Sequence, residues 1–271
     1  MKIAVISDLH LGTGRSDLFG HEESRFLRFL DHLEANFERV ILLGDVFETL
    51  TVRPSRQVRE LRLAREQHKA IVSRFEGDRY TYLHGNHDLV AGHVDGSPDT
   101  LRLEVDGVRL AFLHGHQFDW VVKKARFVSE WAAWLAGMAV RVGLRPVVRA
   151  AQAIEHLVMG VDSADRQRAI AFAGLPLTTL GAPPEARGAV LADAGHDRRV
   201  VAPKIDRFQA AAMGWAATHG VDVVVTGHTH CGLVAPHGDR LFLNSGSCSD
   251  GAFSYLAIDT GAGQYSVEST F

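Results

Sequence analysis

The chain has 271 residues, a length that suits one large domain or one domain with a sizeable insertion. Hydrophobic residues make up 46% and charged residues 23%, values close to the globular average that exclude a disordered or fibrous protein. The formal net charge of −3 lacks the positive excess of a protein that coats nucleic acid. The only cysteines, Cys231 and Cys248, cannot form a secreted disulfide framework, so we expect a cytoplasmic protein.

We expect neither a targeting segment nor a membrane span. The apolar stretch after Lys2 is interrupted at Asp8, which is too early for a signal peptide. The apolar run at 131–140 has about half of the ~20 residues that a spanning helix needs.

The first 117 residues alternate short β-branched runs with helical periodicity, which is typical of βαβ units on a largely parallel sheet. Strands are expected at 3–6, 40–43, 80–83 and 108–113. One helix is predicted by the apolar spacing of Phe26, Leu30, Leu33 and Phe37. A second helix is predicted after Pro54, with a buried stripe at Val58, Leu61, His68, Ile71 and Phe75.

The pattern changes after residue 117. Residues 118–215 are rich in Ala, Val, Trp and Arg, which predicts a mainly helical insertion with a mobile loop at about 181–199. Strand-like sequence resumes at 221–225, 241–243, 253–258 and 265–268. We expect the last three runs to be closing antiparallel strands. The sequence thus predicts one α/β domain formed by 1–117 and 216–271, interrupted by the insertion.

Polar residues follow the first five expected strands of this domain at their carboxyl ends. In chain order they are Asp8 and His10, Asp45, Asn86 and His87, His114, and His228 and His230. In open α/β sheets these strand ends form the crevice where ligands bind, so we expect the side chains to converge. The two-residue spacing within Asp8-Leu9-His10 and His228-Thr229-His230 is expected to place both side chains of each pair on one side of an extended segment.

Two carboxylates, one amide and four imidazoles are too many ligands for one tetrahedral ion and suit two ions that share a carboxylate. Mixed oxygen and imidazole ligation favours manganese, with iron or zinc as alternatives, over calcium or magnesium alone. Glycines beside the ligands, such as Gly44, Gly85, Gly115 and Gly227, allow close backbone approach in such a cleft. We therefore expect a site for two divalent metal ions.

These motifs resemble those of the calcineurin-like metallophosphoesterases: Asp8-x-His10, Gly44-Asp45, Gly85-Asn86-His87-Asp88, His114-Gly115-His116 and Gly227-His228-Thr229-His230. The resemblance implies a two-sheet α/β sandwich with the insertion as a helical cap. It also implies that one ion is held by Asp8, His10, Asp45 and His230. The other ion would be held by Asp45, Asn86, His114 and His228, with Asp45 bridging the two.

The implied activity is metal-dependent hydrolysis of a phosphodiester or phosphomonoester. A hydroxide that bridges the two ions would attack phosphorus in line. His87 is placed to protonate the leaving alkoxide as a general acid, and Asp88 is expected to orient it. From a different class, a non-catalytic binding scaffold is a remote alternative, and replacing Asp45 by Asn would separate the two hypotheses.

A helical insertion after the His114-Gly115 motif also resembles the UDP-2,3-diacylglucosamine pyrophosphohydrolases of the same family, which act on a nucleotide-linked lipid. Those enzymes usually carry Arg where this chain has His87 and Asp where it has His116, so other phosphoester substrates stay open. Between 118 and 150 the insertion has six basic and two acidic residues, and three tryptophans, Trp120, Trp131 and Trp134. This composition suits peripheral membrane contact or a cap over an amphipathic substrate, although the aromatic residues could equally pack the cap onto the core.

Overall fold

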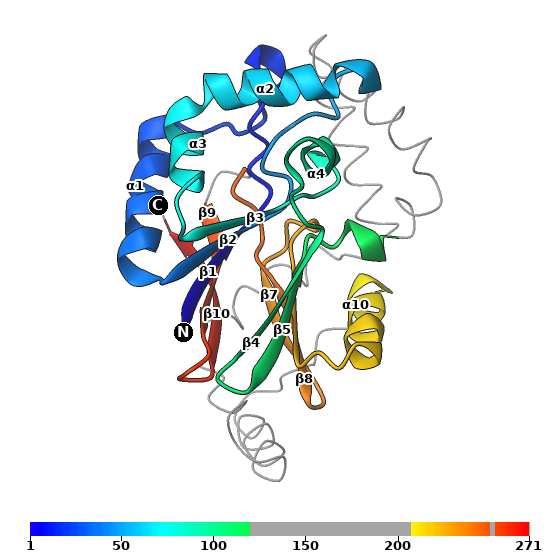
Figure 1. The fold of residues 1–271 in the computed structure, drawn as a ribbon. Coiled ribbons are helices and arrows are strands. Elements are labelled where there is room, and N and C mark those ends of the chain that lie inside the picture. The colour runs from blue at the N-terminus through cyan, green and yellow to red at the C-terminus, as the bar shows by residue number, and fades with distance from the viewer. Residues whose placement is uncertain (120–206, 250–252, 271) are drawn as a thin grey trace.

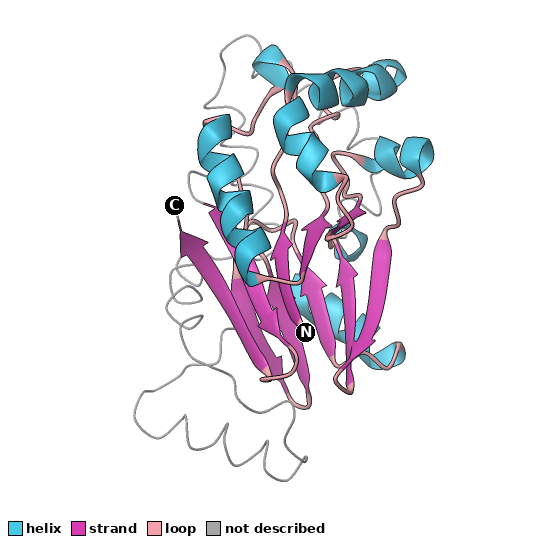
Figure 2. Cartoon of the chain, turned by 60° about the vertical axis from the view of Figure 1, so that its left-hand side comes forward, coloured by secondary structure: helices cyan, strands magenta, loops and turns pink. Residues whose placement is uncertain are grey.

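The computed structural model describes residues 1–119, 207–249 and 253–270 of the chain. Within these residues two five-stranded sheets face each other, and helices cover their outer faces (Figure 1 and Figure 2). This arrangement is the α/β two-sheet sandwich that the motifs imply. Residues 120–206 lie outside the described residues, and with them lie the expected cap, the loop at about 181–199 and the tryptophan-containing stretch up to 150.

The first sheet has the strand order β10-β9-β1-β2-β3. Its strands are β1 (Lys2–Ile6), β2 (Arg39–Leu43), β3 (Tyr80–Leu83), β9 (Phe253–Asp259) and β10 (Gln264–Thr270). Strands β1, β2 and β3 are parallel, whereas β9 pairs antiparallel with both β1 and β10. The expected βαβ units therefore form the centre and one edge of this sheet.

The second sheet has the order β4-β5-β6-β8-β7. Its strands are β4 (Thr100–Val105), β5 (Val108–Leu113), β6 (Val223–Thr226), β7 (Leu233–His237) and β8 (Arg240–Asn244). The expectation of closing antiparallel strands is confirmed for β9 and β10 and only in part for β8, which pairs antiparallel with β7 but parallel with β6. The two edge strands, β4 and β7, were not predicted. β7 lacks an alternation of apolar and polar residues, whereas β4, Thr-Leu-Arg-Leu-Glu-Val, shows one that was overlooked.

Helices cover both outer faces of the sandwich. On the first sheet lie α1 (Glu23–Asn36), α2 (Gln57–Gln67), α3 (Lys69–Phe75) and α4 (Leu89–Asp95), and on the second lies α10 (Arg207–Thr218). Short 3-10 helices are η1 (Gly14–Ser16), η2 (Pro54–Arg56) and η3 (His116–Phe118). The second expected helix is divided into α2 and α3 at His68, and Val58, expected in the buried stripe, is 40% exposed.

Strand β1 shows how the alternation of side chains builds the layers. Ile3 and Val5 point into the core between the two sheets, whereas Ala4 and Ile6 join the core beneath the helices of the first sheet. All four side chains are fully buried. A strand that is apolar on both faces is expected where each face is covered by another layer.

Helix α10 packs against the second sheet through Phe208, Ala212 and Ala216. The domain boundary expected at residue 215 therefore falls inside a helix that belongs to the core. Among the described residues, no helix combines the length and the apolar character that crossing a bilayer requires.

Candidate metal centre

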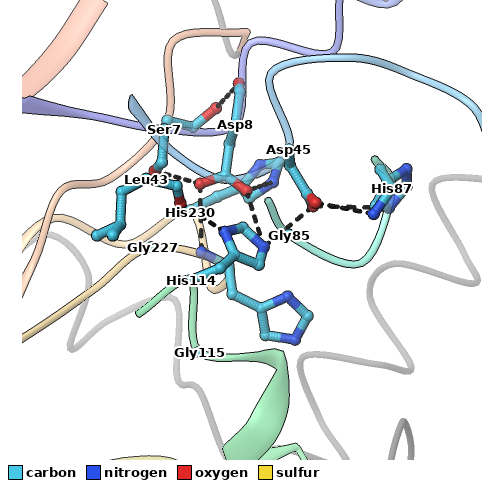
Figure 3. Close-up of polar contacts among 12 residues, drawn as sticks. Ser7, Asp8, Leu43, Asp45, Gly85, His87, His114, Gly115, Gly227 and His230 are labelled. Carbon is cyan, nitrogen blue, oxygen red and sulfur yellow. Dashed lines mark hydrogen bonds and ion pairs between the residues drawn. The ribbon is translucent and has the colours of Figure 1, made fainter. Parts of the chain in front are cut away.

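Each expected ligand lies just beyond the carboxyl end of a parallel strand. Asp8 and His10 follow β1, Asp45 follows β2, Asn86 follows β3, His114 follows β5, and His228 and His230 follow β6. Figure 3 shows Asp8, Asp45, His114 and His230 converging, with His87 on the far side of Asp45. Both sheets thus supply side chains to a single site.

The donor atoms of the expected ligands form two groups, and the atoms within each group lie within 4.8 Å of one another; a third such group, His10, Glu48 and His87, includes only one expected ligand. The first group is Asp8, His10 and His230, and the second is Asp45, His114 and His228. They match part of each expected ligand set, which also included Asp45 as the bridge in the first set and Asn86 in the second.

The two groups lie next to each other. Within the first, His230 Nε2 lies 3.3 Å from Asp8 Oδ1, and within the second, His114 Nε2 lies 3.1 Å from Asp45 Oδ2. The same His114 nitrogen is 3.9 Å from Asp8 Oδ1, so it links the two groups.

Three buried polar atoms at this site fit the requirements of a cation site. Asp8 Oδ1, Asn86 Oδ1 and His114 Nε2 are buried and make no hydrogen bond of good geometry, although Asp8 Oδ1 and His114 Nε2 are within ion-pair distance of His230 and Asp45. Leaving such atoms unsatisfied is costly in a folded protein. Oxygen and imidazole donors with free lone pairs are the ligands that divalent transition ions take, so the residues fit two such ions.

The electrostatics of the site hold its carboxylates in the charged form. Burial raises the pKa of Asp8, but the nearby His230 and His114 outweigh it and lower the pKa to about 2. Burial likewise opposes ionisation of Asp45, yet His114 and His87 place its pKa well below the usual value. Burial lowers the pKa of His114, but Asp45 and Asp8 raise it to about 9. The raised pKa of His114 reflects the negative charge that Asp45 and Asp8 place at this point, a charge that a bound cation would neutralise.

The backbone at the ligands is unusual. Five of them have positive φ angles: Asp8 (56°), His10 (54°), Asp45 (51°), His228 (69°) and His230 (57°). Non-glycine residues rarely adopt this left-handed conformation, and it clusters at functional sites. The expectation of extended segments is therefore wrong for both His-containing pairs. Asp8 and His10 nevertheless belong to one donor group, whereas His228 and His230 belong to different groups.

Gly85 shows why a glycine precedes Asn86. A Cβ at this position would collide with the Asp45 carboxylate, and it would lie 2.7 Å from Asp45 N and 2.8 Å from His114 Cδ2. Only a residue without a side chain lets the loop after β3 approach the loops that follow β2 and β5.

Glu48 is a functional candidate that the sequence reading missed. Its side chain is fully buried, and Oε2 lies 2.7 Å from His87 Nδ1 and 3.2 Å from His10 Nδ1. The backbone N–H groups of Leu50 and Thr51 donate to Oε1 at 2.9 and 3.1 Å. Burial raises the pKa of Glu48, but His87 and His10 outweigh it and lower the pKa to about 2. The sequence feature that could have indicated Glu48 is its position three residues after the expected ligand Asp45.

Asp88 does not orient His87 as expected. Its Oδ1 accepts from the N–H groups of Gly85 (2.6 Å) and Asp45 (3.2 Å). Its Oδ2 accepts from the N–H groups of Val46 (2.8 Å) and Phe47 (3.2 Å) and from the Tyr82 hydroxyl (2.6 Å). Burial and the neighbouring Asp45 raise the pKa of Asp88, against the lowering effect of Tyr82 and the backbone donors. Asp88 therefore fastens the loop that carries Asp45, and the carboxylate beside His87 is Glu48.

His116 lies within the same site, with its ring 5.8 Å from that of His114. Burial and the neighbouring His114 and His228 lower the pKa of His116 to about 3, so its ring is neutral. No ligand role was expected for it.

A two-sheet α/β sandwich with histidine and carboxylate groups clustered at its strand ends defines a class of metallohydrolase-like proteins. The calcineurin-like phosphoesterase family model matches residues 1–232, and the chain belongs to this family. A curated relative, the UDP-2,3-diacylglucosamine hydrolase of Shewanella halifaxensis (strain HAW-EB4), is 26% identical over 147 residues. The match covers 50% of this chain and 58% of the relative, so it spans less than two thirds of that protein.

Solved structures with a similar course of the chain have low sequence identity. An archaeal phosphodiesterase is 15% identical with a TM-score of 0.42, and the match covers 100% of both chains. Vps29 from Entamoeba histolytica in complex with Zn²⁺ is 13% identical with a TM-score of 0.43, over 100% of this chain and 98% of that one.

Proposed function

We propose that the protein is a dinuclear metal-dependent hydrolase of phosphoesters. The observation that carries the proposal is the pair of donor groups, Asp8 with His10 and His230, and Asp45 with His114 and His228, whose members lie within 4.8 Å of one another. Asn86, whose buried amide oxygen has no hydrogen-bond partner, is the proposed fourth ligand of the second group. Divalent ions held there would neutralise phosphoryl oxygens and make a coordinated water more acidic.

His87 is the proposed general acid. A carboxylate can only accept a hydrogen bond, so the 2.7 Å contact with Glu48 places a proton on His87 Nδ1. The other ring nitrogen, Nε2, is left to face the site, 3.9 Å from Asp45 Oδ2. The His87 side chain is 28% exposed, so a bound substrate can reach it. In this position protonated Nε2 would donate its proton to the leaving alkoxide as the ester bond breaks.

A nucleotide-linked lipid is the second candidate substrate. The support for it is the curated relative, which is described as a UDP-2,3-diacylglucosamine hydrolase. Because the aligned part is 26% identical and covers 58% of that protein, a simple phosphodiester or phosphomonoester remains the first candidate.

A substrate panel tests both candidates. Protein stripped with a chelator should lose hydrolysis of an aryl phosphodiester, an aryl phosphomonoester or a UDP-linked lipid, and Mn²⁺ should restore it. Asp45→Asn should abolish the activity, whereas the matched variant Asp95→Asn, at an exposed ion pair with Arg65, should retain it. Full activity after metal removal would refute the proposal, and an intact partner interaction without any hydrolysis would favour a binding scaffold.

A further inference from the structure

A buried carboxylate, Asp119, lies against one of the proposed metal ligands. Its Oδ2 is 3.3 Å from His228 Nε2. The Asp119 side chain is 1% exposed and that of His228 is 5% exposed. The contact is therefore shielded from water, which strengthens it.

The chemistry of this contact fixes which nitrogen carries the proton. A carboxylate has no hydrogen to donate, so the hydrogen bond requires the proton on His228 Nε2. The lone pair of the neutral ring then lies on Nδ1. This leaves Nδ1 as the nitrogen that His228 can offer to an ion.

Two other ligand histidines show the opposite arrangement. His10 Nδ1 is bound by the Glu48 carboxylate at 3.2 Å, and His114 Nδ1 lies 2.8 Å from the backbone oxygen of Leu43. Both rings are thereby left with Nε2 for an ion. Metal-binding histidines generally donate their other N–H to a carboxylate or carbonyl, which orients the ring and raises its basicity. For His228 the partner carboxylate is Asp119. It contacts Nε2 instead of Nδ1, so the nitrogen left for the ion is Nδ1 instead of Nε2.

The sequence between His114 and Asp119 brings the carboxylate back to the site. Gly115 has a φ of 115° and begins η3, and the Phe118 N–H donates to Gly115 O at 2.8 Å. The Asp119 N–H donates to His116 O at 3.2 Å, which closes the turn. One turn of helix thus returns the chain from one ligand, His114, to the partner of another.

Aromatic packing holds the His228 ring from a second side. Phe208 of α10 lies face to face with His228, with ring centroids 6.1 Å apart and an interplanar angle of 26°. Phe118 contacts Phe208 edge to face at 5.9 Å. A Cβ on Gly115 would lie 2.7 Å from Phe208 Cζ, so the glycine is needed for this packing. The His228 ring is therefore contacted both by Asp119 and by Phe208.

We infer that Asp119 is a positioning residue for the second metal ion, fixing His228 in the Nε2–H tautomer so that Nδ1 binds the ion. The inference rests on the proposed metal centre. It predicts that Asp119 affects the affinity of the ion at Asp45, Asn86, His114 and His228 and not that of the ion at Asp8.

Long-range ¹H–¹⁵N NMR of the histidine rings tests the tautomer directly. In Zn²⁺-loaded protein we expect a proton on Nε2 of His228 and on Nδ1 of His10 and His114. The His228 signals can be assigned with His228→Gln. A proton on Nδ1 of His228 would overturn the inference. The same spectrum of metal-free protein at pH 8 gives the His228 tautomer even if zinc does not bind, so failure of the proposed function is distinguished from failure of this inference.

Metal titration tests the consequence. Asp119→Ala should weaken the second ion by about 10- to 100-fold, the range found when such outer carboxylates are removed, and should leave the first ion unchanged. Asp119→Asn keeps the size and an acceptor oxygen, so its effect should fall at the lower end of that range. Asp222→Asn is the matched control, because Asp222 pairs with Arg109 before the start of β6, at the strand end opposite His228. The inference would be overturned if both Asp119 variants bound the two ions as tightly as the wild type. It would also be overturned if the affinities for the two ions fell by the same factor.

Discussion

Replacing Asp88 by Ala tests whether this carboxylate supports the fold or the chemistry. The substitution removes the acceptor of four backbone N–H groups, those of Gly85, Asp45, Val46 and Phe47, at distances of 2.6 to 3.2 Å. An unsatisfied buried donor costs about 1–3 kcal/mol, so even the lower bound gives a loss of about 4 kcal/mol in the free energy of unfolding. For a chain of this size that corresponds to a fall in Tm of about 8–16 °C.

Chemical and thermal denaturation monitored by circular dichroism would measure this loss. Asp95→Ala is the control, since Asp95 forms an ion pair with Arg65 in which both side chains are 30% exposed. Removing such a surface pair should cost no more than about 1 kcal/mol. If Asp88→Ala loses activity but less than about 1 kcal/mol of stability, Asp88 acts in catalysis and the reasoning is refuted.

Three further predictions follow from other contacts. Gly85→Ala should destabilise the protein by about 1–3 kcal/mol and weaken metal binding, because the added Cβ has no room. The control Gly214→Ala, on α10, should have neither effect, because no atom lies within 4 Å of the added Cβ. Equal destabilisation by the two substitutions would show that crowding at Gly85 is not the cause. His87→Gln should lower kcat by about 10²–10⁴ for poor leaving groups and little for nitrophenolate, and a uniform loss would exclude general acid catalysis. The third prediction concerns the pair of Asp17 and His68. Burial disfavours the charged form of each, but the hydrogen bond between them lowers the pKa of Asp17 below its ordinary 3.8 and raises the pKa of His68 above its ordinary 6.5. The Asp17 contribution is lost as pH falls through its lowered pKa and the His68 contribution as pH rises through its raised pKa, so stability from this pair should be greatest between 3.8 and 6.5. Denaturant titrations across pH should show this maximum flattened in His68→Gln, and an unchanged profile would contradict it.

The parallel strands and the convergence of the ligands were predictable because both follow from short-range patterns. A strand apolar on both faces is readable from a run such as Ile3-Ala4-Val5-Ile6, and parallel strands bring their carboxyl ends to one edge. The ends of β1 and β2, and with them Asp8 and Asp45, are therefore expected at the same edge of the sheet.

The partners of the ligands could not be predicted because they depend on tertiary geometry. Glu48 reaches His87 across 39 residues of sequence, and Asp119 reaches His228 across 109. Neither acid belongs to a motif with fixed spacing to its histidine. The role of Asp88 could not be predicted either, because the groups that donate to it are mostly backbone N–H groups, which every sequence provides.

The left-handed ligands raise the question of what holds them in a conformation that costs about 1–3 kcal/mol each. For Asp8, His10 and Asp45 the answer is the backbone: the pairing of β1 with β2 continues beyond the strands. Asp8 N–H donates to Gly44 O at 3.1 Å, and both Leu9 N–H and His10 N–H donate to Asp45 O, at 2.9 and 3.0 Å.

Because these bonds use main-chain atoms, the separation of the two loops is set by the sheet and by the carboxylate of Asp88 rather than by the ligand side chains. Asp88 binds the N–H of Asp45 from the other side, so the strained residue is fixed at both its N–H and its carbonyl. The proposed metal centre is therefore preorganised by the backbone. Loss of one ligand side chain should remove a donor and leave the positions of the others unchanged, whereas loss of Asp88 should disturb them together.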